Sequence, residues 1–268
     1  MGIYCDRYQS GEHEAVWADL LALGKRVHEE PVYSDALAVA RETMSRARTN
    51  IETLIVRLDN IGYQFETARD SPPEFLEKII EMLGRGNPVF EQLRSGFDKT
   101  LAPASTLDER SVYSRAGEWS GNCISELEGY LQGPLPLSLR AWYECIQHVS
   151  FLGSHPILNP GAEAITPLPD PFTLMSLPDA VDYESWESKE GYPIAVDEFF
   201  KANLSREHRY YINFRDARAD TIFADWQKDT FVAYLRRVFK WGGFPGWARH
   251  PNPPSELIGE LTDGLVAI

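Results

Sequence analysis

In the first half of the chain, apolar residues recur at the three- and four-residue spacing of helices. They predict a helix over residues 12–27 and a longer one with Ser34 or Asp35 as its N-cap, ending near Asn60 and Gly62. The apolar positions of the long helix have the spacing of a heptad seam. They are Met44, Ala47, Ile51, Leu54, Leu58 and Ile61. This pattern favours a helix packed antiparallel inside a bundle and leaves a dimerising coiled coil open.

Further helix signals follow. Ser71-Pro72-Pro73-Glu74 combines a capping serine, a proline in the first turn and a glutamate three residues after the serine, and an apolar face continues from it to Leu83. Shorter helices are predicted over residues 88–97 and 120–131, the last ending at Gly133-Pro134. Residues 1–130 therefore read as a helical region.

After Pro134 the elements become short. A helix that starts at about Pro136 leads into a strand over 149–152, and further strands are predicted over 172–175, 193–196 and 210–214. Seven of the chain's 18 prolines lie between Pro156 and Pro193, which excludes long helices there. An amphipathic helix over 231–240 precedes Gly242-Gly243. The predicted fold class is α+β: an N-terminal helical bundle, then a mixed β-sheet with packed helices over residues 131–268. The pattern leaves open whether the two regions form one continuous unit.

The net negative charge of the chain disfavours some classes of binding partner. The 268 residues include 40 Asp and Glu against 26 Lys and Arg, a net charge of −14, in a chain that is 43% hydrophobic. Such an excess of carboxylates disfavours general binding to nucleic acid and to anionic membranes, since both depend on clustered Lys and Arg.

The carboxylates are unevenly distributed. Residues 156–200 hold nine carboxylates and one lysine, a charge of −8, whereas residues 201–250 have a charge of +5. We name residues 179–190 the acidic stretch and predict that it binds a basic protein, with two aromatic side chains as anchors. The predicted partner-binding residues are Asp179, Asp182, Tyr183, Glu184, Trp186, Glu187 and Glu190. A solvated loop and, less favoured, a metal-binding acidic loop are alternatives, although the spacing of a calcium loop is missing.

The sequence contains no GxxxxGK[ST], HExxH or GxSxG motif, and no GxGxxG follows a strand. His148 and His155 are expected on opposite faces of a strand, and Cys145 with His148 lacks a third, orienting group. We therefore assign no catalytic, cofactor-binding or metal-binding residue. Paired carboxylates and seven tryptophans leave a carbohydrate-active hydrolase open. The segment Trp241–Trp247 fits either a stacking loop or, preferably, an apolar latch that folds the C-terminal segment back.

Three features predict a cytoplasmic protein. Residues 1–10 are polar and lack the apolar core of a signal peptide. No apolar run approaches the roughly 20 residues of a membrane-spanning helix. Cys5, Cys123 and Cys145 are too few and too scattered for a disulfide framework, so reduced thiols are expected.

One family resemblance is carried by the second half. The stretch Leu135-Pro136-x-x-Leu139-Arg140-x-Trp142-Tyr143, then Val149-x-Phe151, resembles the start of the SUKH superfamily core. The helix with Phe231-x-x-Tyr234-Leu235 resembles that family's last helix, so the resemblance covers roughly residues 125–250. Gln147-His148 stands where members often have an Asn-Gly turn.

The resemblance implies a non-enzymatic α+β protein. Many bacterial members are immunity proteins that neutralise toxins, often nucleases, and a fungal branch regulates cell-wall synthesis through protein contacts. An acidic surface would block a basic nuclease by imitating the charge of its substrate. Our leading hypothesis is thus a cytosolic protein-binding module, most concretely an immunity protein for a basic, nuclease-type toxin. The hydrolase, and a scaffolding protein that oligomerises through the face bearing Ile51, Leu54 and Leu58, are the alternatives, and oligomeric state is not predicted.

Overall fold

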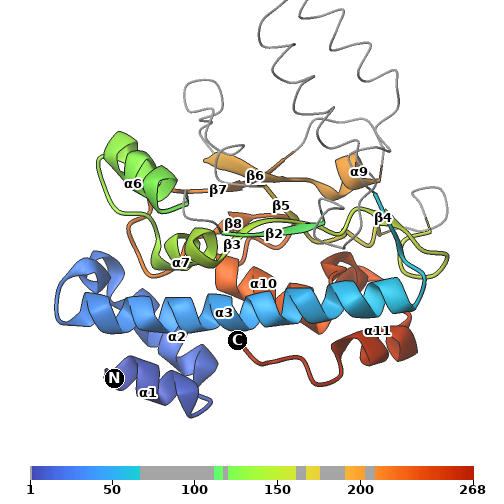
Figure 1. Cartoon of the computed structure of the whole chain (residues 1–268), viewed down its shortest axis with the longest axis horizontal. Helices are drawn as coiled ribbons and strands as arrows, with labels where there is room; N and C mark the ends of the chain where they lie inside the picture. The colour runs from blue at the N-terminus through green and yellow to red at the C-terminus, as the bar shows by residue number, and fades with distance from the viewer. Residues whose placement is uncertain (1, 67–111, 117–119, 161–166, 176–190, 203–208) are drawn as a thin grey trace, which may run out of the picture.

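A long central helix, α3, organises the structure (Figure 1). The structure is a computed structural model that describes residues 2–66, 112–116, 120–160, 167–175, 191–202 and 209–268. The described helices are α1 (Ile3–Gln9), α2 (His13–Ala22), α3 (Val32–Asn60), α6 (Ser120–Leu131), α7 (Leu137–Cys145), α9 (Glu198–Lys201), α10 (Phe231–Lys240) and α11 (Ser255–Thr262), with 3₁₀ turns η1 (Gly24–His28) and η3 (Pro245–Arg249). The described strands are β1 (Gln64–Phe65), β2 (Tyr113–Arg115), β3 (Ile146–Ser150), β4 (Gly153–Ser154), β5 (Thr173–Leu174), β6 (Tyr192–Val196), β7 (Arg209–Ile212) and β8 (Phe223–Ala224).

The fold class is α+β, as predicted, with the N-terminal helices first and small sheets after them. Where we expected a mixed sheet, the described strands pair antiparallel in three sheets, ordered β1-β4, β2-β3-β5 and β6-β7-β8. Proline explains one irregularity: the β6–β7 register shifts between Pro193 and Ala195, because proline has no N–H to donate to the ladder. Short, interrupted strands of this kind do not extend into one large sheet.

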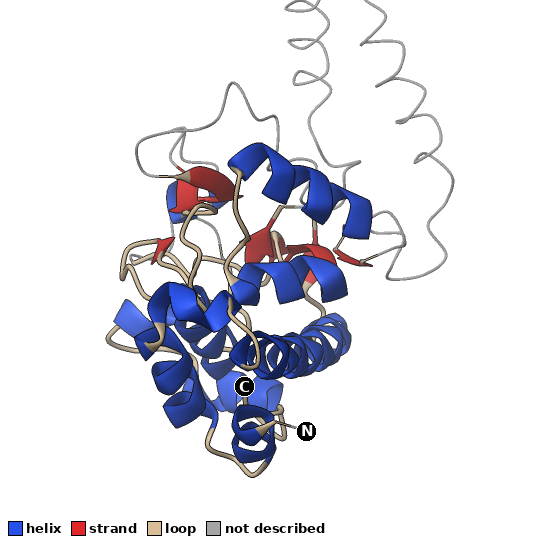
Figure 2. Ribbon diagram, turned by 90° about the vertical axis from the view of Figure 1, so that its left-hand side faces the viewer, coloured by secondary structure: helices blue, strands red, loops and turns tan. Residues whose placement is uncertain are grey.

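Helix α3 lies between the other N-terminal helices and the strands, and it packs along α7 (Figures 1 and 2). The predicted seam is buried from Met44 to Leu58, each residue being fully covered, and Ile61 is partly buried. Because Ile51, Leu54 and Leu58 are covered by the chain itself, this face is not available for the coiled-coil pairing or oligomerisation that we had left open. The hydrophobic core contains buried residues from both predicted regions.

Two predicted helix boundaries were wrong, the start of the long helix and the end of the helix over 12–27. Helix α3 begins at Val32, after Pro31, so neither Ser34 nor Asp35 is its N-cap. The carboxylate of Asp35 instead accepts the backbone N–H groups of Tyr4 and Cys5, at 2.8 and 3.0 Å, in the first turn of α1. The predicted helix over 12–27 stops at Ala22 and continues as η1, because Gly24 adopts a φ of +59°.

The second half follows the predicted order of elements. The strand expected over 149–152 begins earlier, at Ile146, directly after α7. Helix α10 spans the predicted residues 231–240 and ends before Gly242 and Gly243, both at positive φ. A Cβ atom at Gly243 would lie 2.6 Å from the Phe151 ring, so glycine is also required there for packing. The helices predicted over 71–83 and 88–97 lie outside the described residues.

Two further observations bear on the sequence predictions. Cys5, Cys123 and Cys145 are free thiols. Among the described helices, none combines the length and the apolar character that a membrane span requires.

Truncation of Leu54 tests the role of α3. We expect Leu54→Ala to lower the free energy of unfolding by about 2–5 kcal/mol, because it opens a cavity in a fully buried site. Urea denaturation measures this change. Val56→Ala, at a side chain 52% exposed on the same helix, is the control and should stay within about 0.5 kcal/mol of the parent chain. Equal effects of the two substitutions would contradict the central packing of α3.

Candidate functional site

The predicted partner-binding residues all lie outside the described residues, but both ends of their segment are described. Strand β5 ends at Leu174 and β6 begins at Tyr192. Between them, the backbone N–H of Met175 donates to the carbonyl of Ile194 at 2.8 Å. The chain thus leaves for the acidic stretch, and returns from it, at neighbouring points of the strand layer.

The described carboxylates of residues 156–200 are not part of a surface patch. Asp170, Asp197 and Glu198 are all buried. Asp170 accepts hydrogen bonds from Lys201 Nζ at 2.6 Å and from the Tyr210 hydroxyl at 3.2 Å, and the side chains of both Asp170 and Lys201 are fully covered. A buried charge needs such a partner, because desolvation costs several kcal/mol per ion. Together with burial, the Asp170 charge raises the pKa of Tyr210 far above its ordinary value, so the hydroxyl stays a donor.

A second part of this cluster surrounds Trp226. The guanidinium carbons of Arg237 and Arg249 lie 4.7 and 4.5 Å from the centre of its ring. Arg249 also forms an ion pair with Glu198, and Arg237 forms ion pairs with Asp225 and Asp229. Burial raises the pKa of Asp225, while the charge of Arg237 acts in the opposite direction.

Lys201 is the test of this buried cluster. Lys201→Met should destabilise the chain by about 3–5 kcal/mol, because it leaves the Asp170 carboxylate buried without a cation. The double variant Asp170→Asn with Lys201→Met removes both charges and should recover much of that loss. Thermal and urea unfolding of the single and double variants measure the difference. If both variants lose the same stability, the cost does not arise from an unpaired charge.

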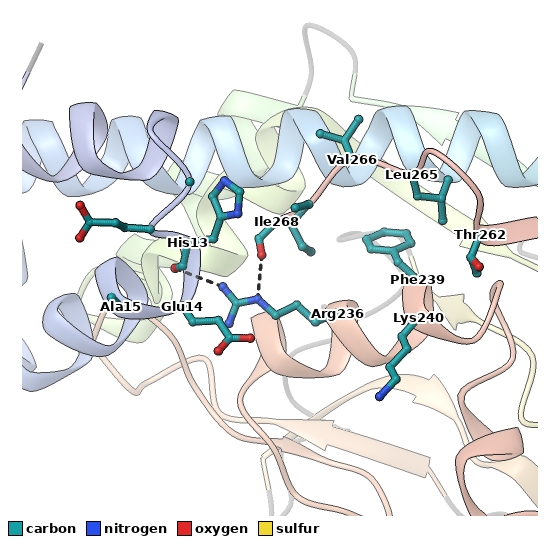
Figure 3. Close-up of a pocket in the computed structure, with 13 residues that line it drawn as sticks. His13, Glu14, Ala15, Arg236, Phe239, Lys240, Thr262, Leu265, Val266 and Ile268 are labelled. Carbon is teal, nitrogen blue, oxygen red and sulfur yellow. Dashed lines mark hydrogen bonds between the residues drawn. The ribbon is translucent and has the colours of Figure 1, made fainter. Parts of the chain in front are cut away.

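A separate pocket of about 670 Å³ opens between α2, α10 and the C-terminal segment (Figure 3). Arg236 lines this pocket. Its Nε donates to the backbone oxygen of Ile268 at 2.8 Å, and its Nη2 donates to the carbonyl of His13 at 3.3 Å. The first turn of α2, Phe239 and Lys240 also line it. Three segments far apart in sequence therefore meet at one arginine.

His13, at this junction, is held in its neutral form. Its Nε2 lies 2.8 Å from Nη1 of Arg46, which can only donate, so Nε2 is the acceptor. Burial and the charges of Arg46 and Arg236 lower the pKa of His13. The centre of the Tyr8 ring lies 4.7 Å from the centre of the His13 imidazole and 5.1 Å from the guanidinium carbon of Arg46, so Tyr8 contacts both side chains.

The pocket does not have the geometry that the hydrolase alternative predicts. Its two carboxylates, Glu12 and Glu14, come from the start of the same helix and do not face each other across a cleft. Glu12 is paired with Arg7. No tryptophan lines this pocket.

The tryptophan-rich segment 241–247 is part of the core. Trp247 is 4% exposed and its Nε1 donates to the Leu158 carbonyl at 3.1 Å. The N–H of Gly246 donates to Pro169, and the carbonyl of Gly243 accepts from Phe172. Of the two interpretations of this segment, these contacts favour the latch.

The surroundings of Cys145 and His155 bear on the nucleophile and metal sites considered from the sequence. The Cys145 thiol lies 3.6 Å from the Met44 carbonyl, and burial raises its pKa, which disfavours the thiolate. The ring nitrogen Nδ1 of His155 accepts the backbone N–H groups of Ile157 and Leu158. Within the part of the chain that the structure describes, no three His, Cys, Asp or Glu side chains are grouped as metal ligands.

Sequence reasoning missed Asp170, Lys201 and Trp226, because charges that pair across the fold have no signal in local spacing. It also missed Arg236, which reads in the sequence as a cation suited to the C-terminal end of a helix.

Comparison with known proteins gives no family. No family model, no curated protein and no solved structure matches the chain.

His13 predicts a pH dependence of stability. Its pKa is lower in the folded chain than in the unfolded chain, where it is about 6.5, so the unfolded chain binds the proton more tightly. The His13 contribution should therefore decline as pH falls below about 6.5 and be fully present above it. His13→Gln keeps a side-chain acceptor without the titration. The difference in urea midpoint between parent and variant should change between neutral and mildly acidic pH, and a constant difference would contradict this account.

Proposed function

We propose that this protein is a non-enzymatic protein-binding module that docks a basic protein through the acidic stretch, residues 179–190. The most concrete form of this proposal is an immunity protein that neutralises a basic, nuclease-type toxin in the cytoplasm. The observation that carries it is the pairing, within the fold, of four of the cations that follow the stretch in sequence.

Residues 201–250 contain ten Lys and Arg, and several of these cations are paired with carboxylates. Among the described residues of this segment, four cations form ion pairs with carboxylates; the Lys201 and Arg237 pairs are buried, and the Arg218 pair is partly exposed. They are Lys201, Arg218, Arg237 and Arg249. These four are held by Asp170, Asp216, Asp225, Asp229 and Glu198, so they do not offset the acidic stretch. That stretch has five carboxylates and one lysine, a charge of −4.

Such a concentration of charge suits recognition of a cationic surface. Long-range attraction raises association rates, and like-charged partners are repelled. A nuclease presents cations to the phosphates of its substrate, so an acidic segment is complementary to the same surface. Tyr183 and Trp186 would add aromatic contacts, which contribute strongly at the centre of an interface.

The immunity form of the proposal draws on the sequence resemblance to the SUKH superfamily, whose expected order is an opening helix, a strand and a closing helix. Helix α7 begins after Leu135-Pro136 and leads directly into β3, short strands follow, and α10 carries Phe231, Tyr234 and Leu235 on its buried face. Trp142 and Tyr143 are buried in the core, as residues that define a helix-to-strand junction would be.

The test is co-expression with the product of the neighbouring gene. We expect a stable complex to co-purify, protection of the host if that product is toxic, and an association rate that falls steeply at high ionic strength. Asp182, Glu184 and Glu187 changed together to Lys should slow association by at least about tenfold, because the steering charge is reversed. Surface plasmon resonance measures the rate.

A matched control reverses equal charge elsewhere. Glu126, Glu256 and Glu260 are exposed, and their joint change to Lys alters the net charge by the same amount. It should leave association much closer to that of the parent chain. Equal rates for the two triple variants would reject the acidic stretch as the docking element, and the absence of any complex would reject the immunity proposal.

A further inference from the structure

The C-terminal residues 265–268 are bound to the rest of the chain in the manner of a peptide ligand. They form no helix or strand and lie between α3, α10 and the start of α2 (Figure 3). The side-chain amide of Asn50, only 1% exposed, makes two hydrogen bonds with one residue. Its Nδ2 donates to the Val266 carbonyl, its Oδ1 accepts the Val266 N–H, and both distances are 2.8 Å.

Two arginines extend this recognition along the backbone. Arg46 donates to the carbonyl of Ala267 at 3.2 Å, and Arg236 donates to the backbone oxygen of Ile268 at 2.8 Å. Three consecutive residues are thus held through backbone atoms, a mode of contact that does not depend on side-chain identity.

Two side chains of the segment are seated: Ile268 is buried, and Leu265 is half-buried and packs against the core. The side chain of Ile268 is buried, with residue exposure of 6%, whereas Val266 is 40% exposed and Ala267 is exposed. The pocket of about 670 Å³ runs beside the segment and leaves one of its sides open. The site therefore binds the backbone of residues 266–268 and one fully seated aliphatic side chain, that of Ile268, with Leu265 packed beside it.

We propose that this site is a peptide-docking groove, which residues 265–268 occupy in the free chain and which an extended segment of a partner protein occupies in a complex. The partner segment is uncharged at the anchor, with a branched aliphatic side chain at the place of Ile268. Asn50, Arg46 and Arg236 bind its backbone as they bind residues 266–268.

Displacement is physically accessible because of how the segment is held. Its polar contacts to Asn50, Arg46 and Arg236 come from side chains and not from a sheet ladder or a helix. Segments of this kind open locally at a lower cost than global unfolding. A partner segment needs only to replace these contacts, and the adjoining pocket gives it an approach.

The experiment uses a fluorescent synthetic peptide with the sequence of Thr262–Ile268 as its probe. Fluorescence anisotropy is measured on the parent chain, on Ile268→Asp and on Ala267→Asp. Ile268→Asp should release the resident segment and bind the peptide at least about tenfold more tightly than the parent chain, because self-occupation competes with the probe. Ala267→Asp places the same charge on the exposed neighbour and should behave like the parent chain.

Asn50→Ala in the Ile268→Asp background should weaken peptide binding about tenfold, through loss of the two hydrogen bonds to the backbone. A folded Ile268→Asp chain that does not bind the peptide, or that binds it equally with and without Asn50, would overturn the proposal.

A second measurement uses the parent chain and does not depend on the folding of a variant. Excess unlabelled peptide should shift the methyl resonance of Ile268 to that of an exposed isoleucine, and an unchanged resonance at saturating peptide would again overturn the proposal. Light scattering distinguishes a second copy as occupant: a dimer of the parent chain that the peptide dissociates would assign the groove to self-association and overturn the assignment to a partner protein.

Discussion

The burial of α3 is the constraint on which the rest of the structure depends. A 29-residue helix with buried residues along most of its length has no stable existence in water by itself, because its apolar side chains need cover. Here α1, η1, α7 and α11 all pack against it. Since these elements come from both ends of the chain, parts of the helical region and of the α+β region are assembled on the same helix.

The second organising principle is the pairing of charge inside an acidic protein. Asp170 with Lys201, and Arg237 with Asp225, are ion pairs in which desolvation is offset by close contact and added hydrogen bonds. The arrangement of Arg237 and Arg249 beside the Trp226 ring joins α10, η3 and the residues after β8. Three cations in the last third of the chain, Lys201, Arg237 and Arg249, are thereby paired with carboxylates of the same fold.

Sequence patterns predicted the elements better than their connections. Periodicity located α3, α6, α7 and α10 because helical burial repeats locally, and aromatic or β-branched runs located β6 and β7. The start of α3 was misplaced because Asp35, a residue favoured at helix N-caps, serves α1 instead, a contact between segments about thirty positions apart. Asn50 reads as a polar interruption of an apolar helix, and only the fold shows that it binds Val266. The acidic stretch stays a prediction from composition.

The closeness of Met175 to Ile194 bears on how freely the length of the segment between them can change. The hydrogen bond between these two residues holds the two described ends of the intervening segment together. The entropic cost of lengthening a segment whose ends are held together is small, about 0.6 kcal/mol for each doubling of its length. Its sequence could therefore be replaced or extended with little effect on the strands that support it. The framework of strands would then stay constant while the segment between Met175 and Ile194 changed.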